Sequence, residues 1–251
     1  MAAEPKIVTA ALIIIGNEIL SGRTKDKNMG FIAERLTELG VRMMEARVVA
    51  DIEAEIVEAV NSLRARYDYV FTTGGIGPTH DDITADAIAR AFGVGISEHP
   101  DAVALLSARY KNPADFTAAR RRMTRVPHGG VLVENPVSTA PGFRVENVYV
   151  FAGIPVVMQA MFESIAHELV GGDPLLSRAV SAYLPEGVIA APLAEIEKAH
   201  PGIEAGSYPF QRDGRFGSSL VLRSTDAALL DRATDALKSM IVELGGEPME
   251  V

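Results

Sequence analysis

The chain has 251 residues, of which 48% are hydrophobic and 23% are charged, a composition that fits one large or two modest folded domains. Because it contains no cysteine, disulfides, a thiolate nucleophile and cysteine-based zinc sites are excluded. The formal net charge of −9 disfavours extended binding to nucleic acid, since that affinity comes largely from Lys and Arg contacts to phosphates.

The first predicted element is a strand over residues 7–15, where nearly every residue is apolar and many are β-branched. This pattern is typical of a parallel strand that is covered on both faces. Its apolar stretch is far shorter than the roughly 20 residues that a membrane span needs. The stretch also lacks the basic flank and the small-residue cleavage site of a signal peptide. We therefore expect no membrane association and a cytoplasmic location.

Strands and helices then alternate. Apolar residues at helical spacing predict helices over residues 28–39 and 52–66, and apolar runs predict strands over 41–49 and 69–73. This order predicts an α/β fold with three layers, α/β/α, around a mostly parallel sheet, in which ligands bind beyond the carboxyl ends of the strands. The elements predicted to follow are helices over 85–92 and 101–109, a strand over 149–151 and a helix over 156–169.

Turn-forming residues concentrate at 171–174, which predicts one domain over residues 1–173 and a second over 174–251. The order of elements changes in the second domain. We expect a strand over 177–184, a helix over 188–199, a hairpin that pairs 203–209 with 218–224, and a helix over 227–244. This order predicts a smaller α+β domain.

The most informative motif is T-T-G-G-I-G-P-T-H-D-D-I-T at residues 72–84, between a predicted strand and a predicted helix. Its glycines permit positive φ and a close approach of backbone N–H groups to an anion, and the helix start adds its dipole, so phosphate is the expected guest. Asp81 and Asp82 would repel a phosphate unless a divalent cation bridges them or one carboxylate handles a proton. The competing interpretation is a tight turn that only starts a helix, with Thr84 as its N-cap.

A second turn, G-N-E-I-L-S-G at residues 16–22, follows the first strand, and Asn28 stands at the start of the next helix, where an N-cap is its ordinary role. In a parallel sheet both turns emerge at the same edge. We therefore expect Glu18, Ser21 and Asp82 to face one cleft.

Other conspicuous residues have plainer interpretations. Arg120, Arg121, Arg122 and Arg125 form a basic cluster that could meet a ligand phosphate or a neighbouring subunit, although a solvated helix face is favoured. The five histidines show no spacing typical of a metal cage, so structural or surface roles are expected for them. No Gly-x-Ser-x-Gly turn supports a Ser-His-Asp triad.

The two turns resemble those of the MoaB/Mog molybdopterin-binding domain, and more closely those of the amino-terminal domain of the CinA competence/damage-inducible proteins. The resemblance extends to residues 135–143, with S-T-A-P-G at 138–142, to 151–155 and, in the second domain, to 198–209. Two departures matter. Asn17 stands where the family usually has Asp, and the chain ends before the nicotinamide-nucleotide deamidase domain of full-length CinA, so we do not expect that activity.

The resemblance also assigns site residues. Asp51 and Asp82 correspond to the acidic pair of the family site, which makes them the expected catalytic residues and metal ligands. The ligand contacts that it implies are Gly16, Asn17, Glu18, Ser21, Gly22, Asn28, Thr73, Gly74, Gly75, Gly77, Pro78, Thr79, Asp81, Ser138, Thr139, Gly142, Gly153 and Pro155.

Two classes of function follow from the resemblance. The first is an enzyme that binds a pterin- or ADP-containing phosphate ligand and uses Mg²⁺, Mn²⁺ or Co²⁺ to hydrolyse a pyrophosphate bond, as in ADP-ribose or FAD. A molybdopterin adenylyltransferase of molybdenum cofactor biosynthesis would need the same phosphate turn. The second class is a non-catalytic molybdopterin-binding module whose metal site is weakened by Asn17. The expected partners are a small phosphate-bearing ligand and further copies of the chain in a dimer or trimer, with neither nucleic acid nor membrane.

Overall fold

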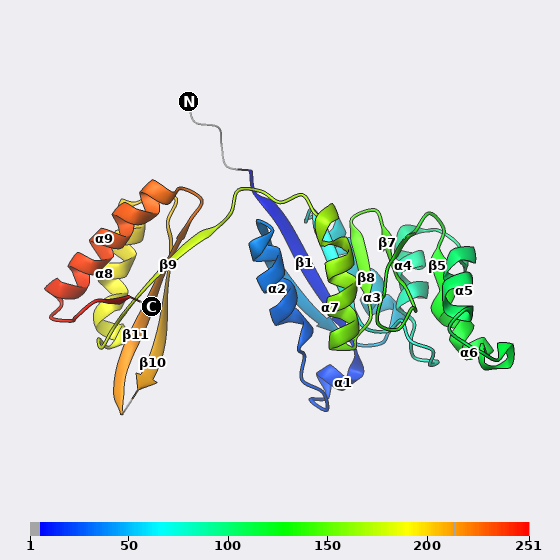
Figure 1. The fold of residues 1–251 in the computed structure, drawn as a ribbon. Coiled ribbons are helices and arrows are strands. Elements are labelled where there is room, and N and C mark those ends of the chain that lie inside the picture. The colour runs from blue at the N-terminus through cyan, green and yellow to red at the C-terminus, as the bar shows by residue number, and fades with distance from the viewer. Residues whose placement is uncertain (1–5, 213, 251) are drawn as a thin grey trace. The chain divides into compact units, whose positions relative to one another are not determined.

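The computed structural model describes residues 6–212 and 214–250 (Figure 1). The predicted domains, 1–173 and 174–251, include residues 1–5, 213 and 251, which lie outside the described residues. The chain divides into two compact units, a first unit from Lys6 to Gly172 and a second unit that begins at Asp173. No helix in the described ranges is long and apolar enough to cross a membrane.

The first unit is built on a six-stranded sheet in the order β2-β1-β3-β8-β7-β6. Its parallel strands are β1 (Val8–Ile15), β2 (Val41–Val49), β3 (Tyr69–Thr73) and β8 (Val148–Phe151). At the far side, β7 (Gly142–Val145) runs antiparallel to β8, and β6 (Val131–Val133) runs antiparallel to β7. Almost every residue of β1 is buried, as its apolar sequence predicts. The predicted mostly parallel sheet is confirmed.

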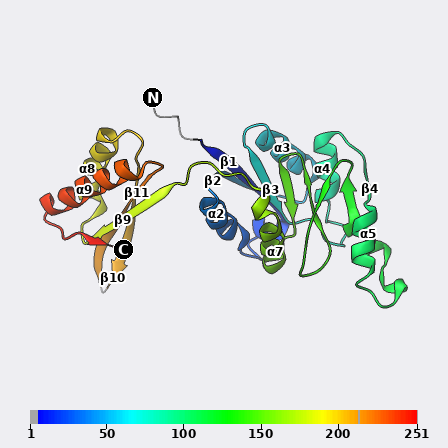
Figure 2. The same ribbon diagram turned by 45° about the horizontal axis from the view of Figure 1, so that its top comes forward.

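Helices cover both faces of this sheet and complete the three predicted layers (Figures 1 and 2). α2 (Asn28–Glu38) and α7 (Pro155–Ile165) bury their apolar side chains against one face. α3 (Glu53–Arg64) and α4 (Thr84–Phe92) do so against the other. The predicted helix over 156–169 begins one residue earlier and ends at Ile165, where a 3-10 turn (Ala166–Glu168) replaces its last part.

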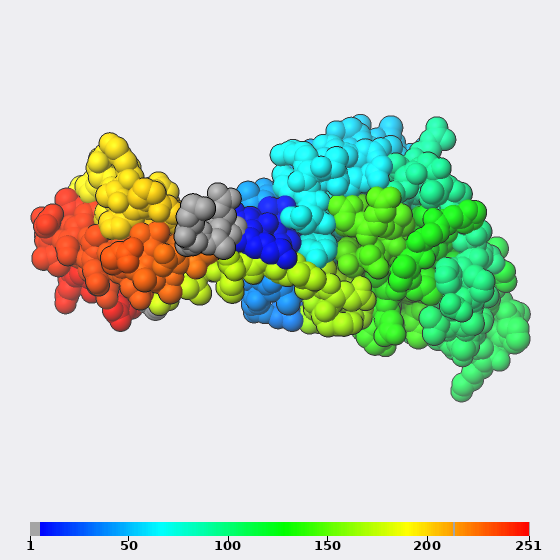
Figure 3. Space-filling model, turned by 90° about the horizontal axis from the view of Figure 1, so that it is seen from above, coloured from blue at the N-terminus to red at the C-terminus, as the bar shows by residue number. Residues whose placement is uncertain are grey.

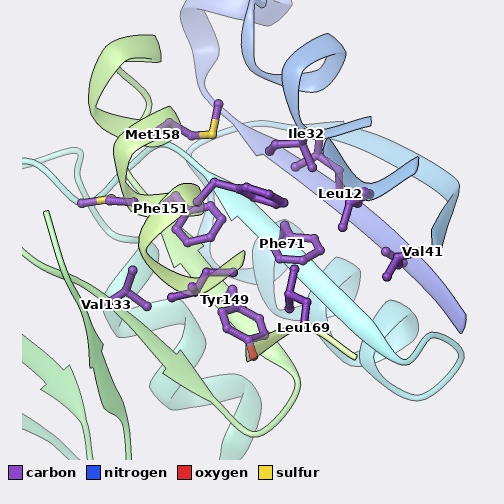
Figure 4. Close-up of a cluster of buried hydrophobic side chains, with 14 of the residues drawn as sticks. Leu12, Ile32, Val41, Phe71, Val133, Tyr149, Phe151, Met158 and Leu169 are labelled. Atoms are coloured by element: carbon purple, nitrogen blue, oxygen red, sulfur yellow. The ribbon is translucent and has the colours of Figure 1, made fainter. Parts of the chain in front are cut away.

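Aromatic side chains form the centre of the core beneath α2 and α7 (Figure 4). The Phe71 ring lies 5.9 Å from that of Phe151 and 5.6 Å from that of Phe162, measured between ring centroids, and all three side chains are fully buried. A buried side chain of this size contributes roughly 1.5–3 kcal/mol. This packing fixes β3 and β8 side by side, and with them the turns that follow both strands.

Short elements of three to eight residues lie between α4 and β8 and at the end of β1. They are α1 (Asn17–Leu20), β4 (Ile96–Glu98), α5 (Pro100–Ser107), α6 (Ala118–Arg121), β5 (Arg125–Pro127) and 3-10 turns at Pro113–Asp115 and Arg122–Thr124. β4 and β5 pair as a separate antiparallel ribbon, and the segment around α5 and α6 lies at one end of the first unit (Figures 1 and 3). Of these elements, only α5 was predicted from the sequence.

The second unit is a four-stranded sheet in the order β10-β11-β9-β12, with α8 and α9 on one face. Its elements are β9 (Leu176–Ala182), α8 (Glu186–Ala199), β10 (Glu204–Arg212), β11 (Arg215–Ser224), α9 (Ala227–Glu243) and β12 (Met249–Glu250). The predicted hairpin is confirmed, since Glu204 pairs with Arg223 and Pro209 with Ser218. This sheet, whose edge strand β10 carries Pro209, confirms the smaller α+β domain.

The register of the parallel strands brings their carboxyl ends to one edge of the first sheet. Ile14 pairs with Thr73 across β1 and β3, and Thr73 pairs with Phe151 across β3 and β8. The predicted placement of Gly16 and Gly74 at the same edge is therefore confirmed. The turns after β1, β3 and β8 all leave the sheet there.

Candidate ligand-binding site

A cavity of about 510 Å³ opens at this edge of the first unit. The turns after β1, β3 and β8 contribute to its wall, together with the loop before β7 and the first residues of α7. Its lining residues are Glu18, Thr24, residues 74–78, Asp82, Met123, Asn135, Ser138, Ala140, residues 152–155, Val157 and Met161. The volume is in the range of pockets that hold a small organic ligand.

The glycine-rich turn is fixed by close backbone packing. Gly74 and Gly75 have φ angles of 104° and 66°, a region that L side chains rarely adopt. A Cβ at Gly74 would lie 2.2 Å from the carbonyl oxygen of Ile15, and one at Gly75 would lie 2.2 Å from Thr84 Oγ1. These two positions therefore require glycine before any ligand is considered.

Thr84 does not serve as the N-cap of α4, and that interpretation of the turn is wrong in this respect. It is the first residue of the helix, and the cap residue Ile83 supplies no side-chain hydrogen bond. The buried Thr84 hydroxyl donates to the Gly74 carbonyl at 3.0 Å, and the Thr84 N–H donates to the Gly75 carbonyl at 3.0 Å. Thr84 thus ties the helix start to the glycine turn.

Asn28 also has a different role from the ordinary N-cap. The cap residue of α2 is Lys27, and the Asp26 carboxylate before it accepts from the N–H groups of Asn28 and Met29 at 3.2 and 3.0 Å. The buried Asn28 side chain instead donates from Nδ2 to the Gly153 carbonyl at 2.9 Å. It therefore holds the turn between β8 and α7, which lines the cavity.

Two carboxylates line the cavity, those of Glu18 and Asp82. Asp82 Oδ2 accepts from the Thr79 N–H at 2.7 Å and from the Thr79 hydroxyl. Asp51, the other residue of the expected acidic pair, does not line the cavity; its Oδ2 accepts from the Asn17 N–H at 2.8 Å, at the start of α1. The structure thus brings Glu18, rather than Asp51, to the cavity that Asp82 lines.

The loop before β7 is organised by Asn135, which was not among the expected ligand contacts. Its buried side chain donates to the Ser138 hydroxyl and to the Ala140 carbonyl, and accepts from the N–H groups of Val137 and Ser138. Thr139 in this loop has a φ of 62°, which is uncommon for a residue with a side chain. The Asn-Pro pair at 135–136 is a turn signal that points to this loop in the sequence.

The expected ligand contacts separate into two groups. Those that line the cavity are Glu18, Gly74, Gly75, Gly77, Pro78, Ser138, Gly153 and Pro155, together with the expected catalytic residue Asp82. Those that do not are Gly16, Asn17, Ser21, Gly22, Asn28, Thr73, Thr79, Asp81, Thr139 and Gly142, and the expected catalytic residue Asp51. Gly142 has a packing role in β7, because a Cβ there would lie 2.4 Å from the Val150 carbonyl oxygen.

The basic cluster does not lie on one solvated helix face, because Arg120 and Arg121 belong to α6, Arg122 to a 3-10 turn and Arg125 to β5, and of the four only Arg121 is exposed. Arg121 forms an ion pair with Glu98, and Arg125 forms one with Asp86. The Arg120 guanidinium lies 4.5 Å from the centroid of the Tyr110 ring. The remaining member, Arg122, donates to the backbone carbonyl of Asp82 at 3.2 Å. Sequence spacing alone does not reveal these partners, because most of them lie on other elements.

A metal site made by protein side chains alone is not present in the described part of the chain, where no group of three or more His, Asp or Glu side chains is placed to hold an ion. The His80 side chain in the turn is almost fully exposed. The cavity's two carboxylates form an incomplete ligand set. Such a set suits Mg²⁺, which usually takes one or two carboxylates and completes its shell with water and substrate phosphates.

Comparison with known proteins places this geometry in a family. Residues 11–172 match the family described as the probable molybdopterin binding domain, and residues 174–245 match the middle domain of FAD synthase. The chain therefore belongs to the family of molybdopterin-binding, MoaB/Mog-type domains. The resemblance noted in the sequence is confirmed.

Individual relatives agree with this assignment. A protein of Pyrobaculum arsenaticum is 36% identical over 210 residues, which cover 80% of this chain and 79% of that protein. A CinA-like protein of Thermosynechococcus vestitus is 27% identical over 251 residues, covering 95% of this chain and 59% of that protein. The crystal structure of the protein CinA, of unknown function, from Thermoplasma acidophilum aligns with a TM-score of 0.61 and 35% identity, and covers 64% of this chain and 98% of that one.

Proposed function

We propose that the cavity binds a pterin- or ADP-containing ligand through its phosphates, and that the chain hydrolyses the pyrophosphate bond of such a ligand with the help of a divalent cation. One observation carries the proposal. The glycine turn, the start of α7 and the carboxylates of Glu18 and Asp82 all line one cavity.

The backbone of the glycine turn supplies the groups that an anion needs. Among the described residues, the N–H groups of Gly75, Ile76 and Gly77 have no hydrogen-bond partner. The 11-residue helix α7 begins at Pro155 beside them, so the positive end of its dipole lies at the same cavity. Both features favour a phosphate group near residues 75–77.

The charge of the cavity wall supports a role for a cation. Of the described residues that line the cavity, none is Lys, Arg or His, whereas Glu18 and Asp82 are acidic. A diphosphate beside these two carboxylates is repelled unless a cation lies between them. Glu18 and Asp82 would hold this cation, which would supply charge neutralisation and a more acidic bound water.

The rest of the wall fits a planar ring. Ile76, Met123, Ile154, Val157 and Met161 give the cavity apolar surface in addition to the two carboxylates. A pterin, adenine or flavin ring needs such surface, and methionine adapts its shape to ligands of different outline. The match of the second unit to a domain of FAD synthase supports FAD as one of the substrates to test.

The test is an activity screen in which ADP-ribose, FAD, and molybdopterin with ATP are each incubated with Mg²⁺, Mn²⁺ or Co²⁺. We expect hydrolysis of at least one diphosphate substrate and, with Asp82→Asn or Glu18→Gln, a loss of roughly 100-fold in rate. Asp81→Asn is the matched control, because this exposed acid is adjacent in sequence but does not line the cavity. Full turnover by Asp82→Asn would refute the metal-assisted mechanism.

The family description names molybdopterin as a ligand, so adenylyl transfer to molybdopterin is the second candidate to test. In the same screen, this activity would release pyrophosphate from ATP only when molybdopterin is present. Tight binding of molybdopterin without turnover of any substrate would instead identify a non-catalytic module, the outcome in which Asn17 has weakened the site.

A further inference from the structure

Behind the glycine turn lies a second, much smaller cavity of about 20 Å³. It shares Ile76, Gly77, Asp82 and Met123 with the wall of the large cavity. Arg122 lines the small cavity but not the large one. Its side chain therefore stands on the other side of the wall that the proposed ligand would touch.

Arg122 differs from the other arginines of the basic cluster. Arg121 and Arg125 are each neutralised by a carboxylate, and Arg120 is stacked on Tyr110. Among the described residues Arg122 forms no ion pair, and its buried Nε has no hydrogen-bond partner. Arg122 is partly buried, and a buried guanidinium nitrogen without a partner is costly, so its retention here calls for a compensating interaction.

The contacts of Arg122 lead to the turn. Its Nη2 atom donates to the Asp82 carbonyl, and the Asp82 carboxylate accepts from Thr79. The Asp82 carboxylate also lies directly against Gly77, where a Cβ would be 2.7 Å from Oδ2. Arg122 thus holds the residue around which the turn from Gly77 to Asp82 is folded.

We propose that Arg122 is a positioning residue for this turn and that its unpaired positive charge balances the phosphates of the ligand from behind the cavity wall. The charge-balancing role rests on the proposed function, because it needs a ligand with phosphates. The positioning role rests on the geometry of the turn alone. In this role Arg122 supplies the fixed positive charge that the lining residues of the acidic cavity lack. Because Arg122 does not line that cavity, it does not compete with the metal for the carboxylates of Glu18 and Asp82.

The test compares Arg122→Gln and Arg122→Lys with the matched control Arg120→Gln, which removes the same charge two residues away. ADP serves as the anionic probe and adenosine as its uncharged counterpart, with affinities measured by calorimetry in Mg²⁺ at low and high salt. For Arg122→Gln we expect ADP affinity to fall on the order of 10-fold and to lose part of its salt dependence. We expect Arg122→Lys to stay within about 3-fold of the parent, and adenosine binding to change in neither variant.

Hydrogen exchange of residues 75–84 without ligand provides the second measurement. We expect faster exchange there in Arg122→Gln and no change in Arg120→Gln. If Arg122→Gln matches Arg120→Gln in both measurements, the inference is overturned. If the parent protein binds no ADP, the proposed nucleotide function and the charge-balancing role fall together, while the exchange data still decide the positioning role.

Discussion

Two parts of the first unit are rich in polar contacts but are held in different ways. At the cavity edge (residues 74–84, 135–140 and 153–155), backbone packs against backbone and buried side chains bond to carbonyl groups. In the β2 network (Glu45, Arg47, Glu58, Arg66 and Tyr67), charged side chains meet at the surface. Direct backbone contacts and buried hydrogen bonds fix geometry, whereas ion pairs between partly exposed side chains are screened by solvent and typically contribute ~0–1 kcal/mol. The cavity edge should therefore be far more sensitive to substitution.

Gly74→Ala should have the largest effect. The added Cβ would meet the Ile15 carbonyl oxygen at 2.2 Å while the residue is held at a φ of 104°, so we expect a loss of roughly 3–5 kcal/mol in the stability of the first unit. Urea-dependent hydrogen exchange of β1 and β3 amides measures this unit separately. Gly93→Ala is the control, because Gly93 also has positive φ but no atom within 4 Å of an added Cβ, and it should cost ~1 kcal/mol. Equal losses would show that packing at the cavity edge is loose.

Asn135→Ala should come next. It removes four hydrogen bonds of a buried side chain and leaves their partners in the 135–140 loop unpaired, which we expect to cost roughly 2–3 kcal/mol. Asn112→Ala removes a single bond from an exposed turn and should cost less than ~1 kcal/mol. The same exchange measurement distinguishes the two variants. A loss for Asn135→Ala no greater than that for Asn112→Ala would mean that the loop is held by other contacts.

Thr84→Val tests the hydroxyl that joins α4 to the glycine turn. The substitution keeps the shape of the side chain but leaves the Gly74 carbonyl without its partner, so we expect a loss of about 1 kcal/mol and faster exchange in residues 74–84. Thr37→Val removes an exposed hydroxyl that bonds within its own helix, and its stability should change by less than ~0.5 kcal/mol. The interpretation of Thr84 fails if both variants unfold alike.

The smallest effect is expected in the β2 network, from Glu45→Gln. Hydrogen bonds from Arg47, and then from Tyr67, lower the pKa of the partly exposed Glu45 carboxyl. Because its folded pKa is depressed, Glu45 stabilises the protein above its ordinary pKa of 4.5, and this contribution is lost as the pH falls through the folded value. Melting temperatures of the two proteins should differ slightly at pH 7 and converge toward pH 3. A difference that does not shrink as the pH falls below 4.5 would contradict the assignment.

The sequence predicts the large elements of the fold and the place of the site, because those depend on local patterns. The apolar run at Val8–Ile15 and the helical spacing in Asn28–Glu38 are visible without a structure. The three-residue strands Ile96–Glu98 and Val131–Val133 are too short to show a clear pattern. They form because a partner from elsewhere in the chain pairs with them.

Side-chain roles at the site depend even more on distant partners. Thr84 and Asn28 both stand where a cap is ordinary, yet they bond to Gly74 and to Gly153. Asp51 bonds at the start of α1, and the Glu18 carboxylate reaches the cavity. The partner of each of these side chains depends on how neighbouring turns meet in space. The spacing of residues along the chain does not show this arrangement.

Pro209 on the edge strand β10 has a consequence for self-association. An edge strand of nine residues offers a row of backbone groups on which a strand of another molecule can add, the first step of sheet aggregation. Proline has no N–H group, so the outer side of β10 lacks a donor near its middle, while Pro209 still pairs in register with Ser218 on the inner side. The second unit can therefore keep a long hairpin without presenting a continuous template for strands of other chains.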